Sequence, residues 1–294
     1  MTSVDSQVVF ITGGGQGIGA EVARRLHAKG AKLVLTDLDE AALAARSAEL
    51  GGDEHVLTVV ADVRDLAAMQ AAADRAVEKF GGIDTVVANA GIASYGSVLK
   101  VDPEAVKRVL DVNLLGVFHT VRATLPSIIE RRGYVLVVSS LAAFTAAPGM
   151  APYDMSKAGN EHLAHALRLE VADLGVAVGS AHMSWIETAM VRDTQADLPT
   201  FREQLAKFPW PLNKTTSVDK CAAAFVDGIE GRKKRVYCPG WVGAFRWLKP
   251  VLSTRLGERL VRTNTGDKLA RMDAEVAALG RSTSAHTQKE LEKS

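Results

Sequence analysis

The sequence has few cysteines and almost no net charge. Its 294 residues include only Cys221 and Cys238, which excludes a fold held together by several disulfides and favours a reducing compartment. The 35 basic residues nearly balance the 34 acidic ones, so the formal net charge is +1. Nucleic acid is therefore not expected as a partner, because proteins that bind it through an overall charge carry a clear basic surplus.

Long apolar runs are also missing. Residues 1–10 lack the basic region and apolar stretch of a secretory signal. Stretches such as Leu141–Pro152 are interrupted by proline and glycine, and they fall short of the roughly 20 residues that a membrane-spanning helix needs. Yet 47% of the residues are apolar, which is too many for a disordered chain. We therefore expect a globular protein that is made and kept in the cytoplasm.

Short β-branched runs alternate with longer stretches rich in alanine and leucine. Strands that are apolar on both faces and separated by helices indicate a parallel sheet covered on each side, an α/β fold of the doubly wound type. The predicted strands are Val8–Thr12, Lys32–Thr36, Val56–Val60, Thr85–Ala88, Val135–Val138, Ala177–Ala181 and Arg235–Cys238. The predicted helices are Gly19–Lys29, Glu40–Leu50, Leu66–Phe80, Pro103–Asn113 and Pro152–Leu174.

A glycine-rich turn follows the first predicted strand and opens the first predicted helix. Its glycines form the pattern G-x-x-x-G-x-G, and residues without Cβ let the backbone turn sharply and approach a pyrophosphate. The phosphate charge then meets the N–H groups at the positive end of the helix. The residues predicted to bind a dinucleotide here are Gly13, Gly15, Gln16, Gly17, Ile18 and Gly19.

Asp37 follows the second predicted strand, 20 residues after Gly17. A carboxylate at this place accepts hydrogen bonds from the adenosine ribose hydroxyls. It also repels the 2′-phosphate of NADP, for which neither Gln16 nor Leu38 supplies a cation. We therefore predict that NAD(H) is preferred over NADP(H). The alternative is that Asp37 only caps the helix that follows.

Five motifs together resemble the short-chain dehydrogenase/reductase family. They are Thr12-Gly-x-x-x-Gly-x-Gly, Asn89-Ala90-Gly91, Asn113, Ser139-Ser140 and Tyr153-x-x-x-Lys157. The resemblance spans about Gln7 to Gly240 and implies a single-domain Rossmann-like fold, a nicotinamide cofactor and the interconversion of alcohols and carbonyls. It also implies that Asn89, Ala90 and Gly91 shape the nucleotide cleft, and that Asp62 and Val63 border the adenine.

Tyr153 and Lys157 are four residues apart on a predicted helix, so their side chains emerge on one face. A phenol is a poor acid–base catalyst at neutral pH, and a nearby ammonium group is expected to lower its pKa. Tyr153 then exchanges a proton with the substrate oxygen, while hydride passes between the substrate carbon and nicotinamide C4. Lys157 is also expected to bind the nicotinamide ribose.

The resemblance assigns roles to two further polar residues. Ser140 precedes Tyr153 by the family's usual 13 residues and is expected to hydrogen-bond the substrate oxygen, a role that Ser139 fits less well. Asn113 is expected to position Lys157 through a chain of waters. Taken singly, each of these residues also fits a structural role, as a helical pair, a loop residue or a residue at a helix bend.

One segment departs from the family pattern. Many members have Pro-Gly followed after three residues by Thr, whereas this chain has Met183-Ser184 before Trp185-Ile186-Glu187-Thr188. Thr188 and the Ile186 backbone are still expected to bind the nicotinamide carboxamide. Residues 189–217 contain three prolines and are predicted to form a mobile substrate lobe. The side chains predicted to surround the substrate are Trp185, Met190, Phe201, Phe208 and Trp210.

The C-terminal part differs in composition, so we predict a catalytic domain over 1–245 and a helical extension over 246–294. Gly228–Arg271 carries eleven basic residues against three acidic ones, and Leu252, Leu256 and Leu260 line one side of a predicted helix. This segment packs on the body or a second subunit, contacts an anionic membrane through 241–271, or guides an anionic substrate. The polar tail from about Arg281 is predicted to be disordered.

The features together predict an NAD(H)-dependent oxidoreductase that interconverts a secondary alcohol and a ketone on an apolar, steroid-, terpenoid- or lipid-like substrate. One alternative is a 3-oxoacyl-thioester reductase, and another is a protein that senses NAD without turnover. No metal site is predicted, because His162 and His165 lack a third ligand. By resemblance, we expect a homodimer or homotetramer that pairs the helix of Tyr153.

Overall fold

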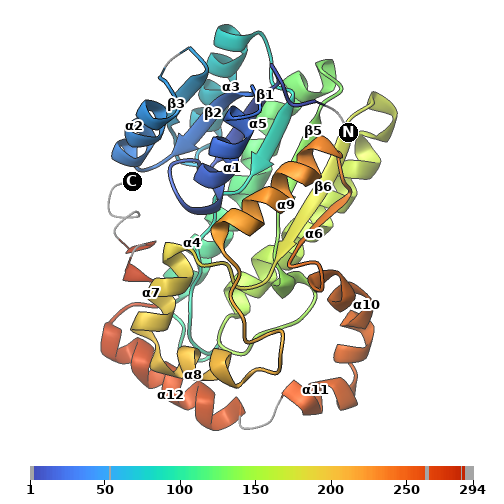
Figure 1. Cartoon of the computed structure of the whole chain (residues 1–294). Helices are drawn as coiled ribbons and strands as arrows, with labels where there is room; N and C mark the ends of the chain where they lie inside the picture. The colour runs from blue at the N-terminus through green and yellow to red at the C-terminus, as the bar shows by residue number, and fades with distance from the viewer. Residues whose placement is uncertain (1–2, 53, 262–264, 286, 289–294) are drawn as a thin grey trace.

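A parallel sheet of seven strands organises the computed structural model, which describes residues 3–52, 54–261, 265–285 and 287–288 (Figure 1). The strand order is β3-β2-β1-β4-β5-β6-β7, and every neighbouring pair is parallel. The strands are β1 (Val8–Thr12), β2 (Lys32–Asp37), β3 (Val56–Val60), β4 (Thr85–Ala88), β5 (Tyr134–Val138), β6 (Ala177–Met183) and β7 (Arg235–Cys238). The predicted doubly wound fold and all its predicted strands are confirmed, each to within two residues at either end.

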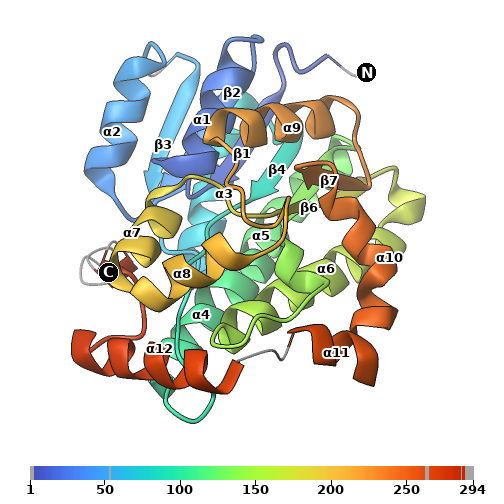
Figure 2. The same ribbon diagram turned by 60° about the horizontal axis from the view of Figure 1, so that its bottom comes forward.

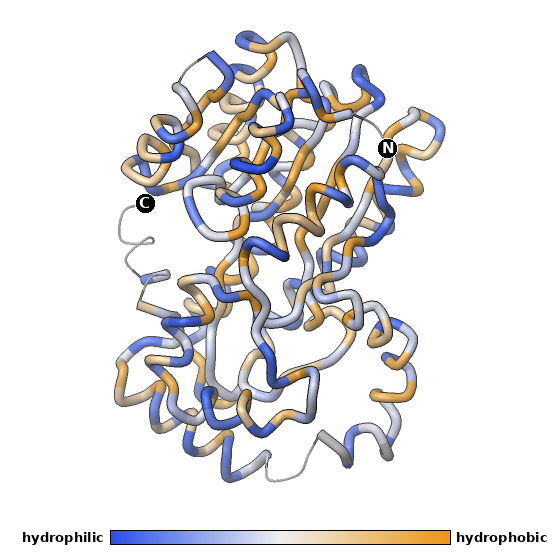
Figure 3. The backbone as a smooth tube through the Cα atoms, in the orientation of Figure 1, coloured by the Kyte–Doolittle hydropathy of each residue, from blue (hydrophilic) through white to orange (hydrophobic). Residues whose placement is uncertain are grey.

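Helices cover both faces of this sheet (Figure 1). The side chains of each strand alternate between the two layers: Val9 and Ile11 of β1 belong to one core, whereas Val8 and Phe10 belong to the other. Figure 3 shows hydrophobic residues concentrated along the strands. The first layer holds α1 (Gly17–His27), α2 (Glu40–Glu49) and α9 (Val218–Glu230), and the second holds α3 (Leu66–Phe80), α5 (Gly116–Glu130) and α6 (Ala151–Glu170).

The segment between β4 and β5 differs from the prediction. The helix predicted over Pro103–Asn113 ends at Leu110 as α4 (Pro103–Leu110), and a π-helical turn, Asp111–Leu115, leads into α5. The pattern did not predict α5, which contains Pro126 and two threonines bonded to carbonyls one turn back. By length and composition the run Pro103–Glu130 is apolar enough to cross a membrane, but half of its most apolar window is buried in the fold.

The predicted substrate lobe contains two ordered helices, α7 (Ala189–Asp197) and α8 (Pro199–Lys207). The C-terminal helix α12 (Thr265–Leu279) runs beside α8 in both views (Figures 1 and 2). The Glu275 carboxylate of α12 accepts hydrogen bonds from the backbone N–H of Thr200, at 3.0 Å, and from its hydroxyl, at 2.7 Å. The lobe is therefore attached to a part of the chain that lies far away in sequence.

The basic segment does not form the continuous helix that was predicted. α10 (Val242–Leu252) ends at Leu252 and α11 (Arg255–Val261) begins three residues later, while the side chains of Leu256 and Leu260 lie outside the described residues. The predicted boundary after residue 245 falls within α10. Membrane contact through 241–271 and pairing of subunits remain predictions.

The predicted disorder of the polar tail is wrong for its described residues, 281–285 and 287–288. Ser282, Thr283 and Thr287 are all buried. The backbone N–H of Tyr95 donates to the Ser282 carbonyl at 2.8 Å, and Ser94 pairs with Thr283 as an antiparallel bridge. A polar composition suggests exposure to solvent, but here the backbone groups and small hydroxyls find partners in a distant loop. Residues 286 and 289–294 of the predicted tail lie outside the described part.

Gly179 of β6 is packed so closely that a substitution can test the contact. A Cβ on Gly179 would overlap the Tyr134 hydroxyl and the Lys233 carbonyl oxygen, which are hydrogen-bonded to each other at 2.7 Å. We expect Gly179→Ala to lower the free energy of unfolding by about 2–3 kcal/mol in urea denaturation followed by circular dichroism. Gly240→Ala is the control, because a Cβ there meets nothing within 4 Å. Equal stability of the two variants would contradict the packing described.

Candidate active site

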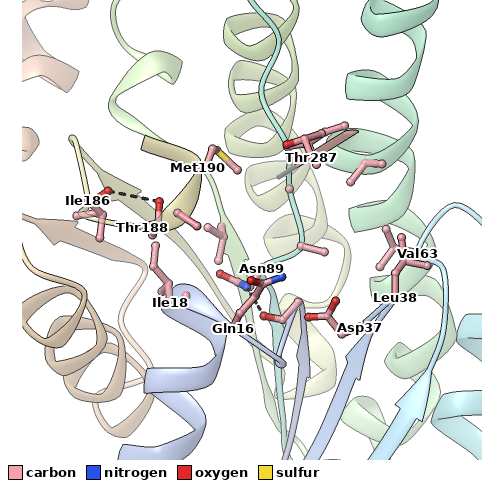
Figure 4. Close-up of a pocket in the computed structure, with 18 of the residues that line it drawn as sticks. Gln16, Ile18, Asp37, Leu38, Val63, Asn89, Ile186, Thr188, Met190 and Thr287 are labelled. Carbon is pink, nitrogen blue, oxygen red and sulfur yellow. Dashed lines mark hydrogen bonds between the residues drawn. The ribbon is translucent and has the colours of Figure 1, made fainter. Parts of the chain in front are cut away.

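A cleft opens at the carboxyl edge of the sheet, where the strand order reverses between β1 and β4 (Figure 4). This switch point is where open α/β sheets bind their ligands. Most of the residues predicted to bind a dinucleotide line the cleft: Gly13, Gln16, Gly17, Ile18, Asp37, Asp62, Val63, Asn89, Ala90, Gly91, Tyr153, Lys157, Ile186 and Thr188. Gly15 and Gly19 are not part of this lining.

The glycine turn has a conformation that requires glycine. Gly13 and Gly17 adopt φ angles of +63° and +57°, and a Cβ on Gly19 would overlap the Gly13 carbonyl oxygen. The Asn89 amide supports the turn by donating to the carbonyl oxygens of Thr12, at 2.9 Å, and Gly13, at 3.2 Å. Helix α1 begins at Gly17, so its positive end meets the cleft. These features fit the pyrophosphate of a dinucleotide.

Asp37 lies at the end of β2, with its carboxylate against the glycine turn. Its Oδ2 accepts a hydrogen bond from the Gly15 N–H at 3.0 Å, and burial raises the pKa of this carboxyl. The helix-cap alternative is wrong, because Asp39 caps α2 by accepting a bond from Ala42 N–H at 3.0 Å. Among the described residues that line the cleft, Lys157 is the only lysine or arginine.

Tyr153 and Lys157 line the cleft together with Ser139, and Ser140 lies beside Tyr153 outside that lining. The Lys157 Nζ lies 5.6 Å from the centroid of the Tyr153 ring and donates to the Val138 carbonyl oxygen at 3.1 Å. The Ser140 hydroxyl interacts with the Tyr153 phenol and is also directed at the Met183 carbonyl oxygen, at 3.4 Å. The Ser139 hydroxyl donates to the Lys157 carbonyl oxygen at 2.8 Å. The bond from Ser140 to the substrate oxygen, in preference to Ser139, stays a prediction.

Burial dominates the protonation of this pair. It raises the pKa of Tyr153 to about 12, although the bond from Ser140 opposes the shift, and it lowers the pKa of Lys157 to about 8. The pKa of Tyr153 was expected to be lowered by Lys157, but in this structure it is raised, because desolvation of the phenol is the largest influence and Lys157 is not among the groups that shift it. At neutral pH Tyr153 keeps its proton and Lys157 is largely charged.

Asn113 lies in the π-helical turn and is completely buried. Its amide accepts from the Ile92 N–H at 2.8 Å and donates to the Ile92 carbonyl oxygen at 2.9 Å and the Ser156 hydroxyl at 3.0 Å. These bonds join the loop after β4 to α6. A Cβ on Gly91 would lie 3.3 Å from Asn113 Oδ1 and 3.4 Å from Lys157 Nζ, so both groups border this glycine. The water chain to Lys157 remains a prediction.

The segment without Pro-Gly still places Thr188 at the cleft. The Ser184 N–H donates to the Cys238 carbonyl oxygen at 3.0 Å, so Ser184 extends the pairing of β6 with β7. Thr188 then caps α7, and its hydroxyl accepts from the Val191 N–H at 3.5 Å. Ser184, in place of the family's usual glycine, adds a buried hydroxyl with no hydrogen-bond partner among the described residues. Sequence reasoning did not identify that hydroxyl.

An apolar cluster surrounds the outer side of Tyr153. Of the predicted substrate residues, Met190 lines the cleft, and Trp185 packs edge-on against Phe201 within the cluster at 5.2 Å between ring centroids. Phe208 and Trp210 lie outside both the cleft and the cluster, and Trp210 is 78% exposed. The remaining members are Ala93, Tyr95, Ala147, Met150, Leu198, Met272 and Val276. Tyr95, Met272 and Val276 were not predicted, because nothing in their local sequence indicates this contact.

The buried ammonium group gives a stability prediction with a defined pH dependence. We expect Lys157→Met to raise the free energy of unfolding by about 1–2 kcal/mol at pH 7 in urea denaturation, because it removes the desolvated charge. Between about pH 8 and 10.5 the unfolded chain binds more protons at Lys157 than the folded protein does. The unaltered protein therefore gains stability from this group across that window, and the advantage of the variant shrinks.

The control is Lys107→Met, which replaces a lysine whose side chain is 69% exposed. That change is expected to leave the stability within about 0.5 kcal/mol at either pH. A Lys157→Met variant that is less stable at pH 7 and shows the same pH dependence as the unaltered protein would contradict the claim that a buried charge at Lys157 destabilises the fold.

Comparison with known proteins identifies the family. The model of the short chain dehydrogenase family matches residues 7–199. The oxidoreductase UcpA of Salmonella typhimurium is 37% identical over 65% of this chain and 73% of its own length. The acetoacetyl-CoA reductase of Synechocystis is 34% identical over 69% of this chain and 80% of its own length.

Solved structures agree. A 3-ketoacyl-(acyl-carrier-protein) reductase from Brucella melitensis, complexed with NADH, superposes with a TM-score of 0.72 at 28% identity, over 80% of this chain and 97% of its own. Levodione reductase superposes with a TM-score of 0.74 at 29% identity, over 82% of this chain and 98% of its own. The chain therefore belongs to the short-chain dehydrogenase family and is an oxidoreductase that uses a nicotinamide cofactor.

Proposed function

We propose that this oxidoreductase interconverts a secondary alcohol and a ketone on an apolar substrate, with NAD(H) as its cofactor. The observation that carries the proposal is the place of Tyr153, which lines the dinucleotide cleft and also packs in the apolar cluster. A substrate that reaches the phenol therefore has the cleft on one side and the side chains of Trp185, Met190 and Phe201 close by. Such a surface suits a hydrocarbon skeleton better than a charged one.

The protonation states suit ketone reduction at neutral pH. Tyr153 holds a proton, which it donates to the carbonyl oxygen as that oxygen gains negative charge. The Ser140 hydroxyl, which lies beside the phenol, turns its single proton to the same substrate oxygen and donates a second hydrogen bond to it. A nicotinamide cofactor held in the cleft would supply the hydride that the carbonyl carbon receives. Lys157 would hold its nicotinamide ribose, and the positive charge of Lys157 would offset the negative charge of the phenolate left on Tyr153. Alcohol oxidation reverses these transfers.

Removing the Tyr153 hydroxyl tests the proton transfer. We expect Tyr153→Phe to reduce turnover at least about 10³-fold, because general acid catalysis contributes on that order, while the Kd for NADH stays within about twofold. Turnover is followed by NADH absorbance with a panel of secondary alcohols and ketones. Tyr95→Phe is the matched control, because the Tyr95 hydroxyl bonds Thr194 and stays outside the lining of the cleft. Substantial turnover by Tyr153→Phe would exclude the proposed role.

A thioester substrate is the second candidate, because two of the similar proteins are an acetoacetyl-CoA reductase and a 3-ketoacyl-(acyl-carrier-protein) reductase. The same assay separates the two proposals when acetoacetyl-CoA joins the panel. Reduction of cyclic or long-chain ketones without reduction of acetoacetyl-CoA supports the apolar alcohol. The opposite pattern assigns the thioester. The family's chemistry gives no support to the alternative of a silent NAD sensor.

The preference for NAD rests on Asp37. Its buried carboxylate faces the cleft where the adenosine ribose is expected, and the adjacent Leu38 supplies no positive charge. We expect the Kd for NADH to be more than about tenfold lower than the Kd for NADPH in fluorescence titrations. The double variant Asp37→Ser, Leu38→Arg is expected to reverse that order. Asp39→Ser is the control, because Asp39 caps α2 outside the lining of the cleft, and it should keep the preference. Equal affinities in the unaltered protein would overturn the assignment.

A further inference from the structure

The C-terminal tail reaches the dinucleotide cleft. We call its described residues 281–285 and 287–288 the strap. At its beginning, the Arg281 guanidinium forms a salt bridge with Asp197 of α7 at 2.8 Å, and each side chain is only about one-fifth exposed. Helix α7 also carries Met190 and Val191, which line the cleft. The strap is therefore attached to the lobe that borders the cleft.

The middle of the strap is attached to the opposite wall. Ser282 accepts a hydrogen bond from the Tyr95 N–H at 2.8 Å through its carbonyl oxygen and one from the Asp102 N–H at 3.3 Å through its hydroxyl. Thr283 pairs with Ser94. These partners belong to the loop that follows β4, which also carries Gly91 and Ile92 of the cleft lining. The strap therefore contacts two walls of the cleft, which the bond between the Tyr95 and Thr194 hydroxyls also joins.

Thr287 is the strap residue that lines the cleft, and only 2% of it is exposed. Figure 4 shows it on the opposite side of the cleft from Gln16 of the glycine turn. Its Oγ1 accepts a hydrogen bond from the Ser284 hydroxyl at 3.1 Å, and its backbone N–H donates to the same hydroxyl at 3.2 Å. Both bonds orient the side chain without using the proton of the Thr287 hydroxyl.

We propose that the strap holds the bound dinucleotide in the cleft and that Thr287 donates a hydrogen bond to it from the side opposite the glycine turn. The inference rests on the proposed NAD(H) function. A dinucleotide enclosed by the glycine turn and the strap leaves only after the strap opens, so the strap sets the rate of cofactor release.

The rate of NADH release tests this proposal directly. Protein loaded with NADH is mixed with excess NAD⁺ in a stopped-flow instrument, and the loss of NADH fluorescence gives the dissociation rate. We expect Thr287→Val, which keeps the shape but removes the hydroxyl, to raise this rate and the Kd about fivefold. Arg281→Ala is expected to raise the rate at least about threefold, and truncation after Gly280 at least about tenfold.

Thr254→Val is the matched control, because Thr254 is exposed at the junction of α10 and α11 and is expected to leave the rate unchanged. An unchanged release rate in Thr287→Val overturns the proposal, even where the truncated chain fails to fold by circular dichroism. Failure of the unaltered protein to bind NADH would refute the proposed function itself. Binding of NADH with normal release from Thr287→Val and Arg281→Ala would refute only the strap.

Discussion

The buried ammonium group of Lys157 constrains the structure around it. A lysine that is 4% exposed, with its pKa lowered to about 8, costs free energy that the rest of the fold has to supply. Neighbouring groups fix it in place: the Val138 carbonyl oxygen accepts a hydrogen bond from its Nζ, and the Ser139 hydroxyl donates to its backbone carbonyl oxygen. Asn113 holds the loop whose Gly91 leaves room for the ammonium group. The two apolar layers of the sheet stabilise this arrangement, in which the charge is held ready for a ligand.

Tyr153 connects two surfaces of different chemistry. On one side, backbone N–H groups, an aspartate and a lysine suit a charged dinucleotide, and on the other Trp185, Phe201 and Met272 suit an apolar molecule. The strands and the glycine turn build the first surface from sequence that the family shares. The second surface combines the lobe of α7 and α8 with α12, so the side of the site that we propose for the substrate depends on the C-terminal part of the chain.

The sequence predicted what local pattern determines. Apolar runs gave the strands, and the spacing of Gly13, Gly17 and Gly19, and of Tyr153 and Lys157, gave the residues of the cleft. Contacts between distant segments were not predictable in this way: neither Thr283 nor Met272 carries a local signal that it meets the loop after β4. The pKa of Tyr153 was misjudged because its burial, rather than its distance from Lys157, decides it. Trp210 lies outside the lining of the cleft and the apolar cluster, because hydrophobicity alone does not determine the course of an irregular segment.

The transfer of hydride at this site is the central claim, and an isotope experiment tests it most directly. NADH carrying two deuterium atoms at nicotinamide C4 is mixed with the enzyme and a ketone that it reduces, and the alcohol is analysed by mass spectrometry. The account predicts one deuterium on the carbinol carbon of the product, with the hydroxyl proton drawn through Tyr153 from water. An alcohol that takes its carbinol hydrogen from the solvent would contradict the account.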